Sequence, residues 1–196
     1  MAKDRAEIRR KLQGLAFRQA GYFSASQARE LGYSYQAQRY NADSGNWVRV
    51  DRGLFRLPDW PDSPWDSLAL WTLWSGGNAV VSHESALAVH ELSDVDPVRV
   101  HLTVPPRFRA QNDAVVIHKA ELNDVDVELR DGFAVTSPLR TLLDVAAGPL
   151  SQEHVDTAIR DALERGLVSA RRLRDRADEA GDRAALRIER ALTVRT

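Results

Sequence analysis

The sequence contains no cysteine, which excludes disulfide bonds, thiolate metal sites and cysteine nucleophiles. This absence agrees with a reducing compartment. The sequence also lacks the run of roughly 18 apolar residues that a membrane-spanning helix needs. Residues 1–30 contain no long apolar run typical of an export signal. We therefore expect a cytoplasmic protein that is not inserted in a membrane.

Motifs of common catalytic and metal sites are lacking as well. There is no GxSxG nucleophile motif, no Gly-rich phosphate loop and no HExxH pair. His83 and His90 lie seven residues apart on one expected helix, too far apart to share one ion. Lys119 is the only lysine after residue 60, and its neighbours do not complete the Asp and Glu-x-Lys set of a nuclease core. We predict no enzyme activity, no metal site and no cofactor.

What the chain does contain is enough apolar material for packed cores and an uneven distribution of charge. Hydrophobic residues make up 43% of the 196 residues, including five Trp and five Phe, which suits one large or two small domains. Residues 1–60 hold 11 Lys and Arg against 6 Asp and Glu, whereas residues 61–196 hold 16 against 22. A basic first third is typical of a DNA-binding module attached to a domain that does not bind DNA.

The most informative segment begins with an expected short helix after Gly32. Tyr33, Ala37 and Tyr40 recur at helical spacing, which predicts the buried side of this helix. Gln and Arg suit base edges in the major groove, and Ser and Tyr suit phosphates. The side chains expected on the opposite, DNA-facing side are Ser34, Tyr35, Gln36, Gln38 and Arg39.

A β-hairpin is predicted directly after this helix. Valines and charged residues alternate over residues 48–51, and apolar residues flank an arginine over residues 55–57. Asp51-Arg52-Gly53 supplies the turn, because Gly53 is free to adopt a positive φ. The expected DNA contacts of the hairpin are Arg49, Arg52 and Arg56, with Arg52 at the tip. Arg49 and Arg56 could instead pair with Asp51 or Asp59.

Two further helices precede this segment. Residues 5–20 carry Ile8, Leu12, Leu15 and Phe17 at helical spacing, and Gly21-Tyr22-Phe23 is expected to close this helix. Ser24 or Ser26 can cap the next helix, which Gly32 ends. Three helices followed by a hairpin predict a winged helix-turn-helix over residues 1–58. A small α/β corner whose polar face meets only solvent is the alternative interpretation.

The remainder predicts an α+β domain over residues 65–196, with a small sheet and flanking helices, after a proline-rich linker at residues 58–64. Residues 65–75 read as an apolar helix, with Trp71 and Trp74 packed in the core. Ser137-Pro138 opens another helix, in which Arg140 and Asp144 form an intrahelical pair, cap a loop or face a partner. The expected strands cover residues 79–81, 98–104, 114–118, 125–129 and 133–136.

Four segments together give the chain a resemblance to the AbiEi family of type IV antitoxins. The resemblance spans roughly residues 10–168. It is carried by NWVRVDRGLFRLP, VVSHESALAVHEL, VRVHLTVP and VTSPLRTLLDVA, in this order.

The resemblance implies an N-terminal winged helix that represses its own operon by binding inverted repeats in double-stranded promoter DNA. Arg52, Gly53, Phe55 and Arg56, with the preceding helix, would serve operator binding. The C-terminal domain would counteract a cognate nucleotidyltransferase toxin, either by binding it or indirectly, with no catalytic role. A related class carries a C-terminal nuclease, but we expect the stand-alone form, and a monomer that binds paired repeats is compatible with it.

Two other functions stay open from the sequence. One is a stand-alone transcriptional regulator whose second domain senses a ligand or dimerises. The other is a degenerate nuclease-associated protein.

Overall fold

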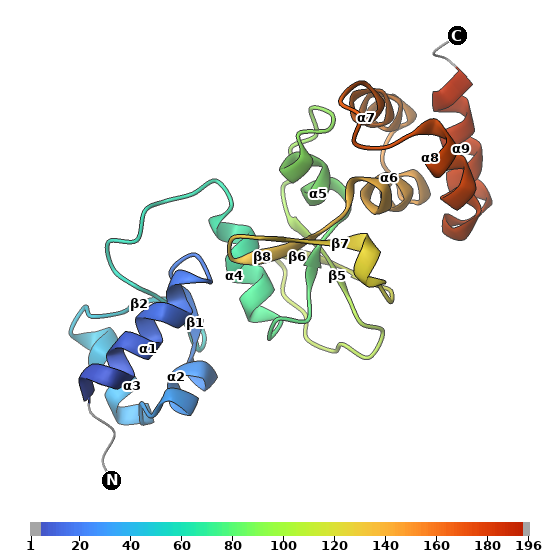
Figure 1. The fold of residues 1–196 in the computed structure, drawn as a ribbon. Coiled ribbons are helices and arrows are strands. Elements are labelled where there is room, and N and C mark those ends of the chain that lie inside the picture. Colours follow the sequence, from blue (N-terminus) through green and yellow to red (C-terminus); the bar gives the residue numbers. More distant parts are fainter. Residues whose placement is uncertain (1–4, 194–196) are drawn as a thin grey trace. The chain divides into compact units, whose positions relative to one another are not determined.

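A computed structural model describes residues 5–193, which form helices and two small sheets (Figure 1). The mixed α+β class predicted from the sequence is confirmed. The first of two compact units comprises the described residues up to Gly77 together with Arg130–Phe133. The second comprises Asn78–Leu129 and the described residues from Ala134 onward. None of the helices between residues 5 and 193 has the length and apolar character needed to span a bilayer.

The first unit contains a three-stranded antiparallel sheet with the strand order β1-β3-β2. Its first strand is an addition to the predicted elements, because Tyr22 and Phe23 pair with β3 instead of closing the first helix. A three-residue strand carries no alternation signal, and its partner lies some thirty residues later in the chain. The elements are α1 (Arg5–Phe17), β1 (Tyr22–Ser24), α2 (Ala25–Leu31), α3 (Tyr35–Asp43), β2 (Val48–Asp51), β3 (Leu54–Arg56) and α4 (Asp66–Trp74).

The boundary of the first unit differs from the predicted one. Helix α4 follows the proline-rich segment, yet it groups with the first unit and contacts β1. Arg56 donates to Asp66 of α4 over 2.7 Å, and both side chains are more than four-fifths buried. A tertiary ion pair of this kind leaves no trace in local composition, so the prolines alone predicted a boundary too early.

An aromatic cluster forms the core of the first unit. The Trp47 ring lies 4.9 Å from the rings of both Phe23 and Tyr33, and 5.3 Å from that of Phe55. Helix α1 adds Leu12 and Ala16 to this core, whereas Phe17, which the sequence places on the inward side, is 72% exposed. The order of apolar residues therefore predicted the helix correctly but placed one edge of its buried stripe wrongly.

The second unit is built on a mixed five-stranded sheet with the order β6-β5-β4-β8-β7. Strand β4 pairs antiparallel with β5 and parallel with β8, and β5 pairs parallel with β6. The predicted strands are confirmed within a few residues. The strands are β4 (Val80–Val81), β5 (Val100–Val104), β6 (Val115–Lys119), β7 (Val127–Arg130) and β8 (Phe133–Thr136); the helices are α5 (His83–His90), α6 (Pro138–Ala147), α7 (Gln152–Glu164), α8 (Ala170–Ala177) and α9 (Asp182–Thr193).

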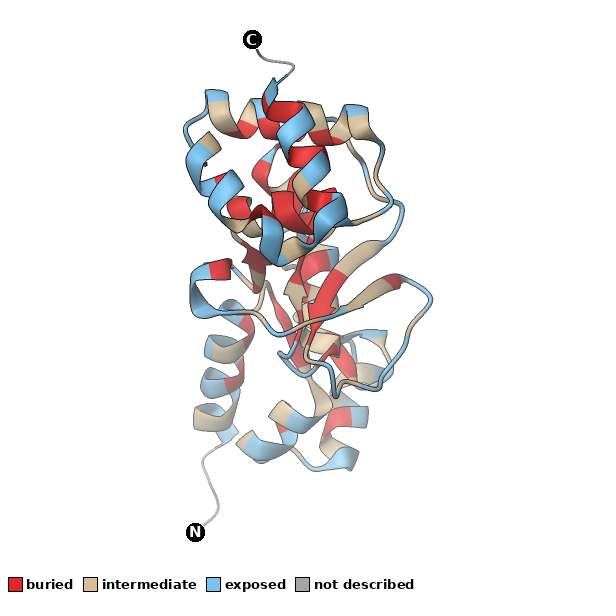
Figure 2. Ribbon diagram, turned by 90° about the vertical axis from the view of Figure 1, so that its right-hand side faces the viewer, coloured by how far each residue is buried: buried red, intermediate tan, exposed pale blue. Residues whose placement is uncertain are grey.

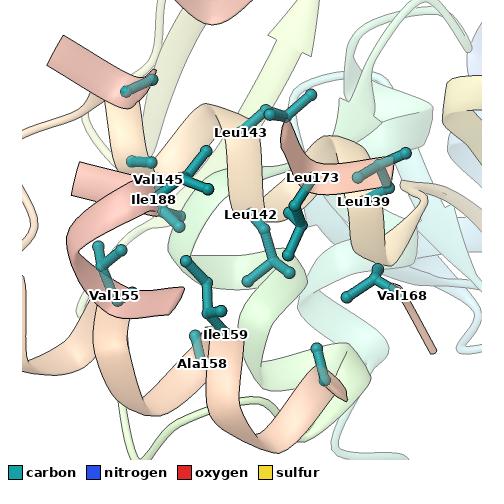
Figure 3. Packing of buried hydrophobic residues seen from close by; sticks show 14 of the residues in the cluster. Leu139, Leu142, Leu143, Val145, Val155, Ala158, Ile159, Val168, Leu173 and Ile188 are labelled. Atoms are coloured by element: carbon teal, nitrogen blue, oxygen red, sulfur yellow. The ribbon is translucent and has the colours of Figure 1, made fainter. Parts of the chain in front are cut away.

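Helices α6 to α9 enclose the larger apolar core (Figure 3). Side chains from all four helices point toward one another there, with Leu142, Ile159, Leu173 and Ile188 at most 1% exposed. The outer sides of the same helices are exposed (Figure 2). Their burial follows from the apolar stripes that recur at helical spacing in the sequence.

Buried polar groups hold the ends of these helices. The Arg187 guanidinium of α9 donates to the carbonyl oxygens of Ala146, Gly148 and Leu150, where α6 ends and turns toward α7. Arg140 Nε donates to Asp144 Oδ1 over 2.8 Å, so the intrahelical pair among the alternatives is confirmed.

Candidate nucleic-acid interface

Helices α2 and α3 are joined by a tight turn whose caps are all local. The Ser24 side chain accepts from the backbone of Gln27 while the Gln27 side chain accepts from the backbone of Ser24, forming a capping box that begins α2. Gly32 ends α2 with φ of 118°, a conformation that favours glycine. Ser34 then caps α3 through the backbone N–H of Ala37. The sequence itself therefore dictates the start and end of each helix.

The outward face of α3 is polar and aromatic. Ser34, Gln36 and Arg39 are exposed, and Tyr35 is 67% exposed. The Tyr35 hydroxyl accepts from Arg29 Nη1 of α2 over 2.9 Å, which restrains its ring. Arg39 lies 3.5 Å from Asp43 with both side chains mostly exposed. Such a surface pair is weak and leaves the guanidinium available to an incoming anion.

Gln38 does not lie on the outward, DNA-facing side of α3, where the sequence analysis placed it. It is only 4% exposed, and its amide nitrogen donates to the carbonyl oxygens of Ala25, at 3.0 Å, and Tyr33, at 3.2 Å. Gln38 therefore ties α3 to the start of α2 and cannot reach a base edge in this conformation. A buried glutamine has no apolar signature, which is why spacing alone assigned it to the outer face.

Tyr40 differs from its predicted position in the opposite direction, because it is exposed where burial was expected. The sequence places it on the buried side with Tyr33 and Ala37, but it is 69% exposed. The inward side is set by Gln38 and Ala42, four residues apart, and Tyr40 lies about 200° around the helix from Gln38. Tyr40 therefore joins the outward face of α3, and sequence reasoning missed it because its ring was counted as core.

The hairpin turn forms as predicted. Asp51 Oδ1 accepts from the backbone N–H of Arg52 over 2.6 Å, and Gly53 adopts φ of 72°. Arg52 lies exposed at the turn. Strand β2 has an irregularity between Arg49 and Asp51, and the Arg49 guanidinium lies 5.7 Å from the Phe55 ring centroid. Arg52 and Arg49 are thus exposed cations on the hairpin.

Arg56 is not available to DNA in this structure. Its side chain is 15% exposed and binds Asp66 over 2.7 Å and Asp62 over 3.1 Å, while stacking over Tyr22. The sequence allowed a pairing with Asp59, but the partners are these two carboxylates further along. The ion pair fastens α4 and explains why this arginine is inward.

A groove beside α3 adds two cations that the sequence did not single out. It has a volume of about 870 Å³ and lies between α1 and α3. Arg5 and Arg9 of α1 line it together with Ser34 and Tyr40. The sequence feature that could have identified Arg5 and Arg9 is their spacing of four residues, which places them on one side of α1.

We expect Gln38→Ala to lower the free energy of unfolding by about 2 kcal/mol, because two buried carbonyl oxygens lose their donor. Urea denaturation of the full chain measures this change. Gln36→Ala, an exposed glutamine two residues away, should change stability by less than about 0.5 kcal/mol. Equal stability of the two variants would contradict the inward role of Gln38.

Comparisons with known proteins give a likeness of fold. No family model matches the sequence, and no curated protein matches it. The chain is similar to the crystal structure of the RV2827C protein from Mycobacterium tuberculosis, with a TM-score of 0.57 and 16% sequence identity. The alignment covers 96% of this chain and 81% of that one, so the two share an architecture over nearly the whole of this chain.

Proposed function

We propose that the first unit is a winged helix-turn-helix that binds double-stranded promoter DNA. The observation that carries this proposal is the outward face of α3, where Ser34, Gln36 and Arg39 stand exposed at the end of a capped helix-turn-helix. A helix of this kind can lie in the major groove with its first residues at base edges. Gln and Arg make bidentate contacts there, chiefly to adenine and guanine respectively.

The strand arrangement supports the same proposal. Strand β1 enters α2 directly, and the β2–β3 hairpin follows α3, with its turn hydrogen-bonded to the start of α2 through Gly53 O and Ala25 N. Arg52 at this turn would meet a phosphate, and Arg5 and Arg9 would extend the basic surface along α1. The charge excess of residues 1–60 has the sign that this role requires.

For the whole chain we propose an antitoxin of a type IV toxin–antitoxin system. The support is the sequence resemblance, which runs through SHESALAVHEL and SPLRTLLDVA of the second unit. In this proposal the first unit represses the operon, and the second counteracts a nucleotidyltransferase toxin without chemistry of its own.

Replacing Arg52 with Ala should weaken binding to promoter and unrelated DNA alike, because a contact at the hairpin turn is mainly electrostatic. We expect the slope of the logarithm of the binding constant against the logarithm of the salt concentration to fall in magnitude by about one, which corresponds to one lost phosphate contact. Titrations at several salt concentrations measure it. Arg171→Ala is the matched control, since Arg171 is 91% exposed but belongs to the second unit. A selective loss on promoter DNA would contradict the assignment of Arg52 to the phosphates.

Replacing Gln36 with Ala should instead cost about 1–3 kcal/mol on promoter DNA only, because a base-edge contact is lost. Competition binding between promoter and scrambled duplexes measures the difference. Gln111→Ala, an exposed glutamine of the second unit, should leave both affinities unchanged. Equal losses on both duplexes would remove Gln36 from the set of base-reading residues.

The antitoxin proposal is tested separately by growth rescue. In this proposal a nucleotidyltransferase toxin is encoded beside the chain. Co-expression of the full chain with that toxin should restore growth, and the Arg52→Ala variant should rescue as well while repressing less. Colony counts and a promoter reporter measure the two effects. If the wild-type chain fails to rescue, the antitoxin role is wrong even where DNA binding holds.

A further inference from the structure

Three histidines of the second unit meet in one cluster that the proposed function does not use. His83 begins α5, His101 lies on β5 and His118 lies on β6. Glu84, the second residue of α5, completes what we call the histidine cluster. The side chains of His101 and Glu84 are only 16% and 14% exposed, so their contacts form largely out of water.

The contacts of His101 specify which of the facing nitrogens of His101 and His118 carries a proton. His101 Nδ1 is 2.7 Å from Glu84 Oε2 and 3.2 Å from His118 Nε2. A carboxylate only accepts, so His101 Nδ1 carries the proton and donates it. His118 Nε2 then faces an N–H group and must be the unprotonated nitrogen of its ring. A proton added to it would oppose the proton of His101.

His83 is held by a second chain of hydrogen bonds and by stacking. The Thr103 hydroxyl donates to Ser82 Oγ over 2.8 Å, and Ser82 Oγ is hydrogen-bonded to His83 Nδ1 over 3.0 Å. The His83 ring stacks on the His118 ring with centroids 3.5 Å apart and planes 12° apart. Its backbone adopts φ of 50°, an uncommon conformation that surrounding contacts must maintain.

The electrostatic surroundings keep the stacked pair uncharged. Burial, followed by the neighbouring His118, lowers the pKa of His83 to about 3, and the charges of His101 and of Arg140 on α6 act in the same direction. Burial, followed by His101, lowers the pKa of His118 to about 4. Glu84 opposes both shifts without overcoming them.

Metal binding is a different use of such a cluster, but the geometry does not favour it. Within residues 5–193, no group of three or more His, Cys, Asp or Glu side chains is placed to hold a metal ion. His101 Nδ1 is engaged with Glu84 Oε2 and His118 Nε2, so these two ring nitrogens already have partners within the protein. The property that these contacts affect most directly is the protonation of His83 and His118, which they oppose.

We propose that the histidine cluster is a proton-sensitive lock. Uncharged, it holds the first turn of α5 against β5 and β6; proton uptake by His83 and His118 drives the stacked rings apart and releases that turn. Two adjacent cations 3.5 Å apart repel, and the single carboxylate of Glu84 already serves His101. Because α5 packs on both β5 and α6, the release loosens the second unit.

The pH dependence has a defined sign. In the unfolded chain these histidines titrate near 6.5, above their folded pKa values of about 3 and about 4. The unfolded state therefore binds more protons between about pH 4 and 6.5, and stability falls as the pH is lowered through this window. Each histidine should raise the unfolding equilibrium constant by about 30-fold between pH 7.5 and pH 5.

The test uses the full chain in urea, where hydrogen exchange of the β5 amides measures the unfolding equilibrium of the second unit. His118→Phe keeps a ring to stack on His83 but removes one titrating group. The increase in the unfolding equilibrium constant between pH 7.5 and pH 5 should therefore be about 30-fold smaller than in the wild-type chain. His154→Gln, a histidine of α7 outside the cluster, should leave the rise unchanged. An unchanged rise in His118→Phe would overturn the proposal.

Histidine NMR of the wild-type chain gives a second readout that does not depend on a variant folding. At pH 7.5 we expect His118 to be neutral with its proton on Nδ1, and His83 to be neutral. On acidification both rings should stay neutral to below pH 5 and then titrate together, with faster amide exchange in the first turn of α5. Independent titration of both near 6.5 would equally overturn the lock.

Discussion

The packing of Trp47 is the interaction on which the first unit depends. This side chain is 5% exposed and lies between α3 and β2, where it meets Phe23 of β1, Tyr33 before α3 and Phe55 of β3. Edge-to-face and tilted aromatic contacts of this kind are directional as well as apolar. They fix the outward face of α3 and the hairpin turn relative to each other, as the proposed DNA-binding role of these two elements requires.

Buried polar groups with fixed partners give both units their precise geometry. Gln38 joins α3 to the start of α2, and Arg187 donates hydrogen bonds to the carbonyl oxygens at the end of α6. The histidine cluster joins α5 to the sheet. A buried polar group is costly unless its partners are present. Each such group therefore accepts few alternative arrangements, and in the histidine cluster the same restriction makes the structure responsive to protons.

Much of the fold was predictable because its signals are local. The Ser24 cap, the Asp51–Gly53 turn and the helix opening at Pro138 depend on residues within one turn of each other, and each is confirmed. The candidate site was predicted less well. Gln38 and Arg56 turned inward and Tyr40 turned outward, because their positions depend on partners distant in sequence or on a neighbouring helix. Strand β1 and the placement of α4 were missed for the same reason.

The sequence by itself determined the capped helix ends, the hairpin turn, the α+β class and the basic character of the first third. Caps, glycines and apolar periodicity act over a few residues, so their effect can be read directly from the chain. Only the tertiary structure decided which polar side chains face outward and which histidines meet. That choice depends on burial against partners far apart in the sequence, as when His101 and His118 come together across adjacent parallel strands.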